Sequence, residues 1–136
     1  MKTNILLLLT PKDSVEYLDD SMTLRQAIEK MKVHKYSSIP VIDKASGKYI
    51  GTLSEGDLMW NMYENKYMTK DLEEHSLLDI LDTNRCRALK VSATIEDLLK
   101  TIINQNFVPI VDDRDVLMGI ITRKAVINAL IKNDEN

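Results

Sequence analysis

A short pattern of apolar and turn-forming residues occurs twice in this chain of 136 residues. The first copy is the apolar run 38–43, a loop, and a second apolar run, 49–53, which leads into Ser54. Near the C-terminus the runs 107–112 and 117–121 repeat this order. Short apolar runs bounded by turn residues are typical of strands. Each copy therefore predicts two strands followed by a helix.

A second pattern precedes each copy and is typical of an amphipathic helix. Its apolar positions are Leu24, Ala27, Ile28 and Met31 in the first copy and Ile95, Leu98, Leu99 and Ile102 in the second. This spacing places one apolar face on each helix. Thr23 and Thr94 are the predicted N-caps and lie 71 positions apart, whereas Pro109 follows Pro40 by 69. The small losses of length fall where loops are expected, so the whole unit of strand, helix, strand, strand and helix is repeated.

The repeat predicts an α+β fold with two repeats, 9–66 and 83–132, joined by the segment 67–82. A unit of this size is too small to be stable alone, so we expect the two repeats to pack sheet to sheet into one module. The stretch 61–82 contains no Pro or Gly and ends in an apolar cluster. We expect it to be largely helical and to pack the halves together, and we expect the polar tail 132–136 to fray.

Composition excludes several classes of function. The formal net charge is −3, with 18 basic and 21 acidic residues, so no basic surface for nucleic acid is predicted. Cys86 is the only cysteine, which rules out an intrachain disulfide and a cysteine-based zinc site and fits a reducing, cytoplasmic location. The apolar run 5–9 is shorter than a signal-peptide core of about 7 to 15 residues or a membrane span of about 20. We expect it to dock on the core as a helix or strand, with no membrane insertion.

The two copies together resemble a tandem pair of cystathionine β-synthase (CBS) domains, the regulatory unit called a Bateman module. The resemblance is carried by 39–43 with 51–58 and by 108–112 with 119–122, and it covers the chain from about residue 9 to residue 131. It implies two repeats related by a pseudo-twofold axis, two clefts between them, adenosine-containing ligands in one or both clefts, and frequent dimerisation. The stand-alone form is similar to small bacterial proteins that bind cyclic di-AMP or AMP-like ligands and signal to a partner protein.

Ser54 and Asp57 open the predicted helix of the first copy and have two interpretations. A serine followed three residues later by an acid is close to a capping box, which stabilises a helix start. Alternatively, the hydroxyl and the backbone donors at the helix N-terminus face a nucleotide, and the Asp57 carboxylate accepts hydrogen bonds from ribose hydroxyls. Both interpretations stay open from the sequence.

The second copy departs from this pattern. Thr122 keeps the hydroxyl, but Ala125 stands where the first copy has Asp57. Arg123 and Lys124 follow Thr122 at a helix start, where cations oppose the helix dipole. Such a local conflict favours anion binding, and the alternative is a pair of solvated surface charges.

Carried over to this chain, the resemblance implies two different clefts, each combining segments of both repeats. The residues of cleft 1 are Ser54, Asp57, Arg85, Cys86, Arg87, Asn106, Phe107, Val108 and Pro109, with Cys86 expected on a strand. The residues of cleft 2 are Ser14, Val15, Glu16, Tyr36, Ser37, Ser38, Pro40, Thr122, Arg123 and Lys124. Each cleft contains an aromatic residue that either stacks on a purine or packs in the core. Cleft 2 resembles the cyclic di-AMP version.

No pattern of catalytic residues is present: there is no nucleophile and base pair, no Gly-rich phosphate loop and no metal-ligand cluster. His34 and His75 are expected at helix ends or on the surface, and the cluster Met59, Trp60, Met62 and Tyr63 in the core or in a dimer interface. The absence of such a pattern predicts a non-enzymatic protein, and the resemblance implies a homodimeric sensor of an adenine nucleotide that requires no cofactor and acts on an effector protein. The alternative is a ligand-independent dimerisation or interaction module.

Overall fold

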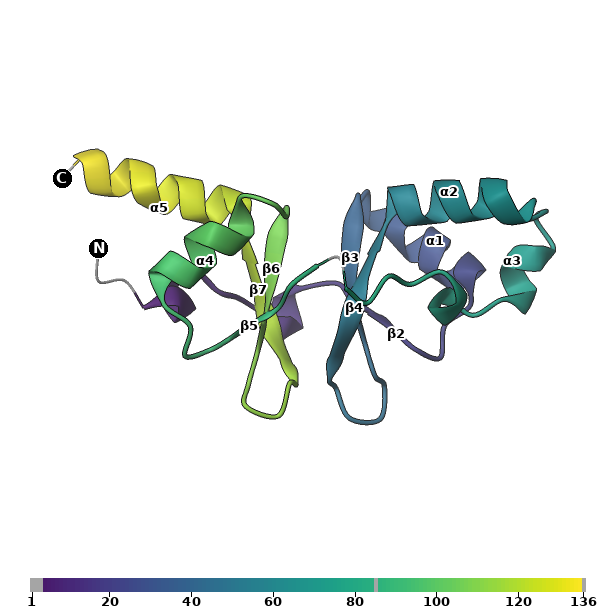
Figure 1. Ribbon diagram of the computed structural model, residues 1–136, viewed down its shortest axis with the longest axis horizontal. Helices are drawn as coiled ribbons and strands as arrows, with labels where there is room; N and C mark the ends of the chain where they lie inside the picture. The colour runs from purple at the N-terminus through teal and green to yellow at the C-terminus, as the bar shows by residue number, and fades with distance from the viewer. Residues whose placement is uncertain (1–3, 85, 136) are drawn as a thin grey trace. The chain divides into compact units, whose positions relative to one another are not determined.

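The computed structural model describes residues 4–84 and 86–135 (Figure 1). The chain divides into two compact units. The first-repeat unit is Glu16–Arg85, and the second-repeat unit combines Met1–Val15 with Cys86–Asn136. Each unit contains a small sheet covered by helices, and each follows the predicted order of strand, helix, strand, strand and helix. The predicted α+β class is confirmed.

The first-repeat unit is built on a three-stranded sheet in the order β2-β3-β4. Its elements are β2 (Leu18–Asp19), α1 (Leu24–His34), β3 (Ser38–Ile42), β4 (Tyr49–Ser54) and α2 (Glu55–Asn65). β3 pairs in parallel with β2 and antiparallel with β4. The core joins Leu24, Ala27 and Met31 of α1 to Ile39 and Val41 of β3, so the apolar face predicted for α1 lies against the sheet.

The second-repeat unit has a four-stranded sheet in the order β1-β7-β6-β5. Its elements are η1 (Ile5–Leu8), β1 (Thr10–Pro11), η2 (Lys12–Ser14), β5 (Leu89–Lys90), α4 (Ile95–Ile102), β6 (Phe107–Val111), β7 (Leu117–Thr122) and α5 (Arg123–Glu135). The predicted apolar face of α4 supplies Ile95, Leu98 and Ile102 to the core. The tail that was expected to fray instead continues α5 as far as Glu135, because no Gly or Pro ends the helix earlier.

The N-terminal segment packs with the second repeat. Thr10 and Pro11 pair with Ile120 and Gly119 of β7, and Ile5 is fully buried in the core that α4 covers. The predicted docking of the apolar run on a core is confirmed, in the form of the 3-10 helix η1. Residues 9–15, the start of the predicted first repeat, thus lie in the second-repeat unit.

Capping boxes begin the first helix of each repeat. In α1 the Gln26 backbone N–H donates to Thr23 Oγ1 over 3.2 Å, and Thr23 N–H donates to Gln26 Oε1 over 2.9 Å. In α4 the Asp97 N–H donates to Thr94 Oγ1 over 3.1 Å, and the Thr94 N–H donates back over 3.2 Å. The Thr94 backbone N–H, and then its hydroxyl, hold the pKa of Asp97 below its usual value. The predicted N-caps are confirmed.

The connecting segment is less helical than expected. α2 ends at Asn65 because Lys66 adopts a left-handed conformation with φ of 55°, and only two short pieces follow, α3 (Asp71–Glu74) and η3 (Leu77–Asp79). Leu77 and Ile80 are buried in the core of the first-repeat unit. The segment is therefore an integral part of that unit.

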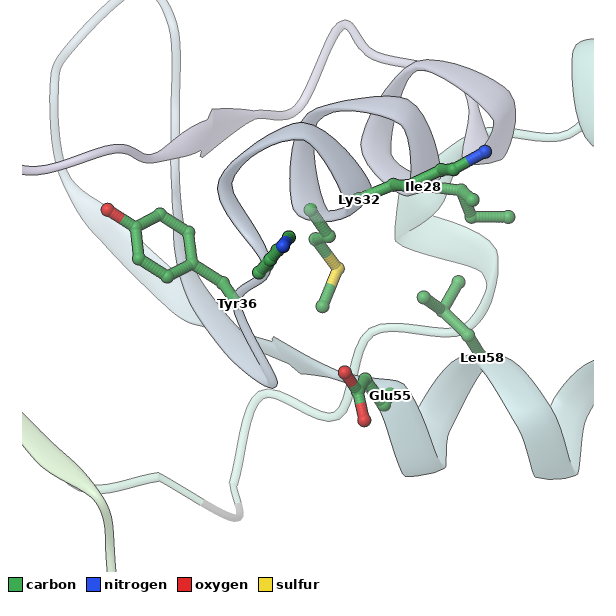
Figure 2. A pocket seen from close by; sticks show the side chains of 7 residues that line it. Ile28, Lys32, Tyr36, Glu55 and Leu58 are labelled. Carbon is green, nitrogen blue, oxygen red and sulfur yellow. The ribbon is translucent and has the colours of Figure 1, made fainter.

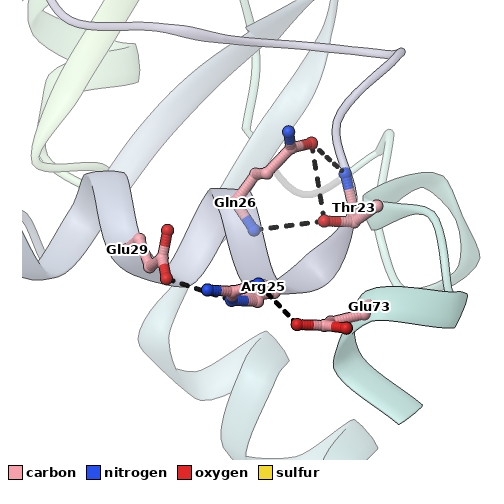
Figure 3. A network of polar contacts seen from close by, with 5 residues as sticks. All are labelled: Thr23, Arg25, Gln26, Glu29 and Glu73. Atoms are coloured by element: carbon pink, nitrogen blue, oxygen red, sulfur yellow. Dashed lines mark hydrogen bonds and ion pairs between the residues drawn. The ribbon is translucent and has the colours of Figure 1, made fainter. Parts of the chain in front are cut away.

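A polar network fastens α3 to α1 (Figure 3). Arg25 contacts Glu29 one turn further along α1, with Nε 3.1 Å from Glu29 Oε1, and it also contacts Glu73 of α3. All three side chains are more than half exposed, so each ion pair stabilises by only about 0.2 to 1 kcal/mol. Burial of Leu77 is the larger contribution to the attachment of this segment.

Within 4–84 and 86–135, no helix has the length and apolar character needed to span a lipid bilayer.

Candidate functional site

The first-repeat unit places the turn before β3 beside the start of α2. Ser38 of β3 lies opposite Ser54, the last residue of β4 and the N-cap of α2. The Glu55 backbone N–H donates to the Ser37 carbonyl oxygen over 2.9 Å. Ser37, Ser38 and Ser54, which were predicted for two different clefts, thus come together within one repeat.

Ser54 and Asp57 form a complete capping box. The Asp57 N–H donates to Ser54 Oγ over 3.1 Å, and the Ser54 N–H donates to Asp57 Oδ2 over 2.9 Å. The capping interpretation of these residues is confirmed. Asp57 is only 7% exposed, which is unusual for a carboxylate. An ionised carboxylate can accept several hydrogen bonds, so the capping bond does not by itself exclude the ligand interpretation, which stays a prediction.

The second-repeat unit repeats this arrangement with different side chains. Thr122, the last residue of β7, lies opposite Phe107, and the Arg123 N–H donates to the Asn106 carbonyl oxygen over 2.9 Å. Thr122 Oγ1 accepts from the Ala125 N–H over 3.1 Å. Because Ala125 has no carboxylate, the helix start lacks the second bond of a capping box. The backbone of the two helix starts is equivalent and their chemistry differs.

The Arg123 side chain binds the end of α4. Its Nε donates to the Ile102 carbonyl oxygen over 3.1 Å, and its Nη2 donates to the Gln105 carbonyl oxygen over 2.8 Å. A cation at these carbonyls is favoured by the dipole of α4, so the conflict that we inferred at the start of α5 is offset by a contact with another helix. The alternative of a solvated Arg123 is wrong, whereas the Lys124 side chain is exposed.

We expect Arg123→Ala to lower the free energy of unfolding by about 1.5 kcal/mol or more, because it removes two charge-assisted hydrogen bonds in a partly buried place. Lys124→Ala is the matched control, and it should change stability by less than about 0.5 kcal/mol. Urea denaturation followed by circular dichroism measures both. Equal stability of the two variants would show that the Arg123 contacts with α4 contribute nothing.

Gln105 is a residue of this region that the sequence pattern did not reveal. Its Oε1 accepts from the Arg87 N–H over 2.7 Å, and its Nε2 donates to the carbonyl oxygens of Arg87 and Phe107 over 3.0 and 2.9 Å. Nε2 also lies 3.3 Å from Cys86 Sγ. Gln105 thus joins 86–87 to the turn at 106–107. No spacing rule signals a side chain that bridges residues this far apart in the sequence.

Cys86 and Arg87 precede the strand on which Cys86 was expected. Cys86 lies in a bend, and β5 begins only at Leu89. The expectation was wrong because Cys86 and Arg87 form the connection that leads into β5. The residues of β5 that pair with β6 are Leu89 and Lys90. Arg85, which was also predicted for cleft 1, lies outside the described residues.

The two aromatic residues of the predicted clefts differ in exposure. Phe107 is 7% exposed and Tyr36 is 38% exposed. Pro40 of β3 and Pro109 of β6 are buried, as is Val108. Tyr36 therefore has more ring surface available for a stacking partner than Phe107 has.

The remaining predicted residues follow η2. Ser14 is exposed at the end of η2, and Val15, its C-cap, is half-buried. Glu16 is engaged with α1: its Oε2 lies 3.3 Å from Lys30 Nζ and its Oε1 lies 3.6 Å from His34 Nε2. Ser14 and Val15 belong to the second-repeat unit and Glu16 to the first. Both predicted clefts combine residues of the two units, and they stay predictions.

A pocket of about 390 Å³ opens between the end of α1 and the start of α2 (Figure 2). Its apolar wall is formed by Ile28, Met31 and Leu58, and its polar lining by Lys32, Lys35, Tyr36 and Glu55. Tyr36 is the only lining residue that the sequence predicted for a ligand site. The pocket itself was not predicted, because it depends on how two helices meet.

The cluster on α2 is divided between core and surface. Met62 packs against the core of the first-repeat unit, whereas Met59, Trp60 and Tyr63 are 57%, 59% and 77% exposed. Among the described residues, no group of three or more His, Cys, Asp or Glu side chains is arranged to hold a metal ion. His34 ends α1, as expected for a helix-end histidine.

Comparison with known proteins identifies the family. The model of the CBS domain matches twice, over residues 8–64 and 67–132. An uncharacterized protein of Methanocaldococcus jannaschii is 29% identical over 127 residues, which is 84% of this chain and 45% of that protein. The chain thus spans about half the length of this curated relative.

Two solved structures share the fold of the whole chain. Listeria monocytogenes CbpB in complex with c-di-AMP has a TM-score of 0.87 and 20% identity, over 98% of this chain and 98% of that one. CBSX2 in complex with AMP has a TM-score of 0.77 and 22% identity, over 96% and 98%. At this identity the likeness establishes the fold, and the two family matches cover most of the sequence. The chain belongs to the CBS domain family, of which it contains two tandem domains.

Proposed function

We propose that this chain is a non-enzymatic, cytoplasmic regulatory module that binds an adenosine-containing nucleotide, either AMP, ADP, ATP or cyclic di-AMP, and signals to a partner protein. The observation that carries the proposal is the start of α2, where a buried carboxylate, Asp57, lies next to the turn that bears the exposed Tyr36. CbpB and CBSX2, which share the fold, were solved with c-di-AMP and AMP.

In the first repeat, Asp57 accepts hydrogen bonds from the ribose hydroxyls. Its capping bond to the Ser54 N–H holds the carboxylate in place, so little side-chain freedom is lost on binding. Tyr36 stacks on a purine, a contact worth about 1 to 3 kcal/mol in sites where bases stack on aromatic side chains. The first repeat thus supplies two groups that recognise a nucleoside, the ribose acceptor Asp57 in cleft 1 and the aromatic ring of Tyr36 in cleft 2.

In the second repeat, cations bind the phosphates. Arg123 uses Nε and Nη2 for the carbonyls at the end of α4, and a guanidinium carries further N–H groups that are able to meet a phosphate. Lys124 is exposed beside it. Because Ala125 cannot accept from a ribose, we assign this repeat to the anionic part of the ligand, as in a site for cyclic di-AMP.

Signalling requires that the ligand prefers one arrangement of the protein over another, since equal affinity for both shifts nothing. We propose that the protein is a homodimer and that the exposed side chains Met59, Trp60 and Tyr63 of α2 form part of the surface that a second copy covers. The same surface favours the alternative function, a dimerisation module that acts without a ligand.

A thermal-shift panel tests the proposal. The probes are AMP, ADP, ATP, S-adenosylmethionine and cyclic di-AMP, each at up to millimolar concentration. A ligand at about a hundred times its Kd stabilises the protein by about 2.7 kcal/mol, which raises Tm by several degrees. We expect at least one nucleotide to do so with the wild type and Asp57→Ala to lose the response.

Asp97→Ala is the matched control for Asp57→Ala. Both variants lose the acid of a capping box, but Asp97 lies at the start of α4 and outside the predicted clefts. The nucleotide response should persist in Asp97→Ala. No response of the wild type to any probe would refute nucleotide sensing and leave the ligand-independent module. Turnover of a nucleotide that is lost in Asp57→Ala would instead show an enzyme.

A further inference from the structure

The Tyr36 ring is connected to Glu16 through His34, in an arrangement that the sequence pattern did not reveal. The rings of His34 and Tyr36 are stacked, with centroids 5.7 Å apart and planes inclined by 17°. His34 Nε2 lies 3.6 Å from Glu16 Oε1. The carboxylate, the imidazole and the phenol ring thus form a continuous row in the first-repeat unit.

Glu16 is held in this row from the other side as well. Its second oxygen, Oε2, lies 3.3 Å from Lys30 Nζ, and Lys30 also donates to the Tyr17 carbonyl oxygen over 2.6 Å. Lys30 and His34 lie one turn apart on α1, so the helix binds both oxygens of the carboxylate. This engagement gives Glu16 a different role from the direct ligand contact that was predicted for it.

The backbone that carries Tyr36 is fixed independently of this row. Lys35 adopts a left-handed conformation with φ of 57°, and the Tyr36 N–H donates to the Met31 carbonyl oxygen over 3.1 Å, which closes the end of α1. The side chain remains 38% exposed. Stacking of the His34 imidazole therefore affects the orientation of the Tyr36 side chain and not the conformation of the Tyr36 backbone.

We infer that Glu16 and His34 are positioning residues that hold the Tyr36 ring ready for a purine, and that protonation of His34 strengthens this hold. The inference rests on the proposed function and adds a regulation of the same site. Histidine is the side chain that normally changes charge between about pH 5 and 8. Imidazolium pairs with Glu16 and is attracted to the face of an aromatic ring. Nucleotide affinity therefore increases as the pH falls through neutrality.

The charged groups around His34 set the size of this effect. The Glu16 carboxylate favours the imidazolium, whereas Lys30, on the other side of Glu16, and Lys35, the next residue, oppose it. Both partners in the His34 pair are 37% exposed, so solvent screens the attraction. We expect an increase in affinity of about two- to five-fold between about pH 8 and pH 5.5.

The test measures Kd against pH by calorimetry with cyclic di-AMP and with adenosine, on the whole chain of 136 residues. The phosphodiesters of the first probe keep their charge over this range and the second has no phosphate, so neither probe adds a titration of its own near neutrality. In His34→Gln we expect a constant, weak affinity equal to that of the wild type at high pH. Tyr36→Leu should weaken binding further and remove the pH dependence.

Two further variants separate positioning from other roles of a histidine. Glu16→Gln keeps His34 but removes its partner, so a positioning role predicts a flat profile, whereas a direct contact of His34 with phosphate predicts that the profile persists with cyclic di-AMP. His75→Gln is the matched control: His75 also stacks on a tyrosine, Tyr67, and lies 3.2 Å from a carboxylate oxygen of Asp79, outside the predicted clefts. It should retain the wild-type profile.

The outcomes distinguish this inference from the proposed function. Binding by the wild type with a Kd that does not vary with pH would overturn the inference and leave nucleotide sensing intact. A pH profile that survives in His34→Gln or in Glu16→Gln would also overturn it. Failure of the folded wild type to bind either probe at any pH would overturn this inference, and nucleotide sensing would be overturned with it only if AMP, ADP and ATP also gave no thermal shift.

Discussion

Leu77→Ala is expected to lower the free energy of unfolding by about 2 to 5 kcal/mol, the cost of emptying a leucine site in a packed core. Leu77 is fully buried in the core of the first-repeat unit, together with Leu24 and Ala27 of α1. Its backbone is fixed too, because its N–H donates to the Met22 carbonyl oxygen over 3.1 Å. Urea denaturation followed by the fluorescence of Trp60, on α2 of the same unit, measures the loss.

Leu78→Ala is the control, since its side chain is the next in the chain and 46% exposed. It should change stability by less than about 0.5 kcal/mol. A small effect of both substitutions would mean that the connecting segment is a linker with little attachment to the first-repeat unit. A large effect of Leu77→Ala alone confirms that a truncated first repeat without this segment would lack part of its core.

The order of the elements could be predicted because it depends on local chemistry. The helix starts at Thr23, Ser54 and Thr94 are signalled by a hydroxyl with an acceptor three residues later, and all three form capping boxes. The strands are short apolar runs next to turn residues. Helix ends were harder to predict, because Lys35 and Lys66 take the left-handed position where Gly is the usual signal.

The environment of the candidate site residues could not be predicted, because it depends on tertiary contacts. Arg123 was correctly singled out as a cation at a helix start, but its two acceptors are the carbonyl oxygens of Ile102, the last residue of α4, and Gln105, in the turn that follows. The ligand contact of Glu16 stays a prediction, but its contacts with Lys30 and His34 could not be read from the sequence. Sequence patterns indicated which residues carry the chemistry, and packing determined which of their atoms are already engaged.

The pairing of the N-terminal segment with β7 leads to the second large expected effect, that of Gly119→Ala. A Cβ atom at Gly119 would lie 2.2 Å from the Thr10 carbonyl oxygen and 3.0 Å from Pro11 Cα. These are backbone atoms of β1, so they cannot move aside as the end of a side chain does. We expect the substitution to lower the free energy of unfolding by about 1 to 3 kcal/mol and to displace β1 from the sheet.

Gly56→Ala provides the comparison for stability, because its Cβ would meet only Ser54 Oγ, at 3.7 Å, and alanine is the better helix former. It should leave the unfolding transition unchanged or raise it slightly. Gly119→Ala should also weaken nucleotide binding, since β1 leads directly into η2 and the predicted site residues Ser14 and Val15. Limited proteolysis after Lys12 reports the release of β1, and calorimetry reports the affinity. If Gly119→Ala resists cleavage and unfolds like the wild type, β1 tolerates a side chain at position 119. The close pairing of β1 with β7 would then not determine the positions of Ser14 and Val15.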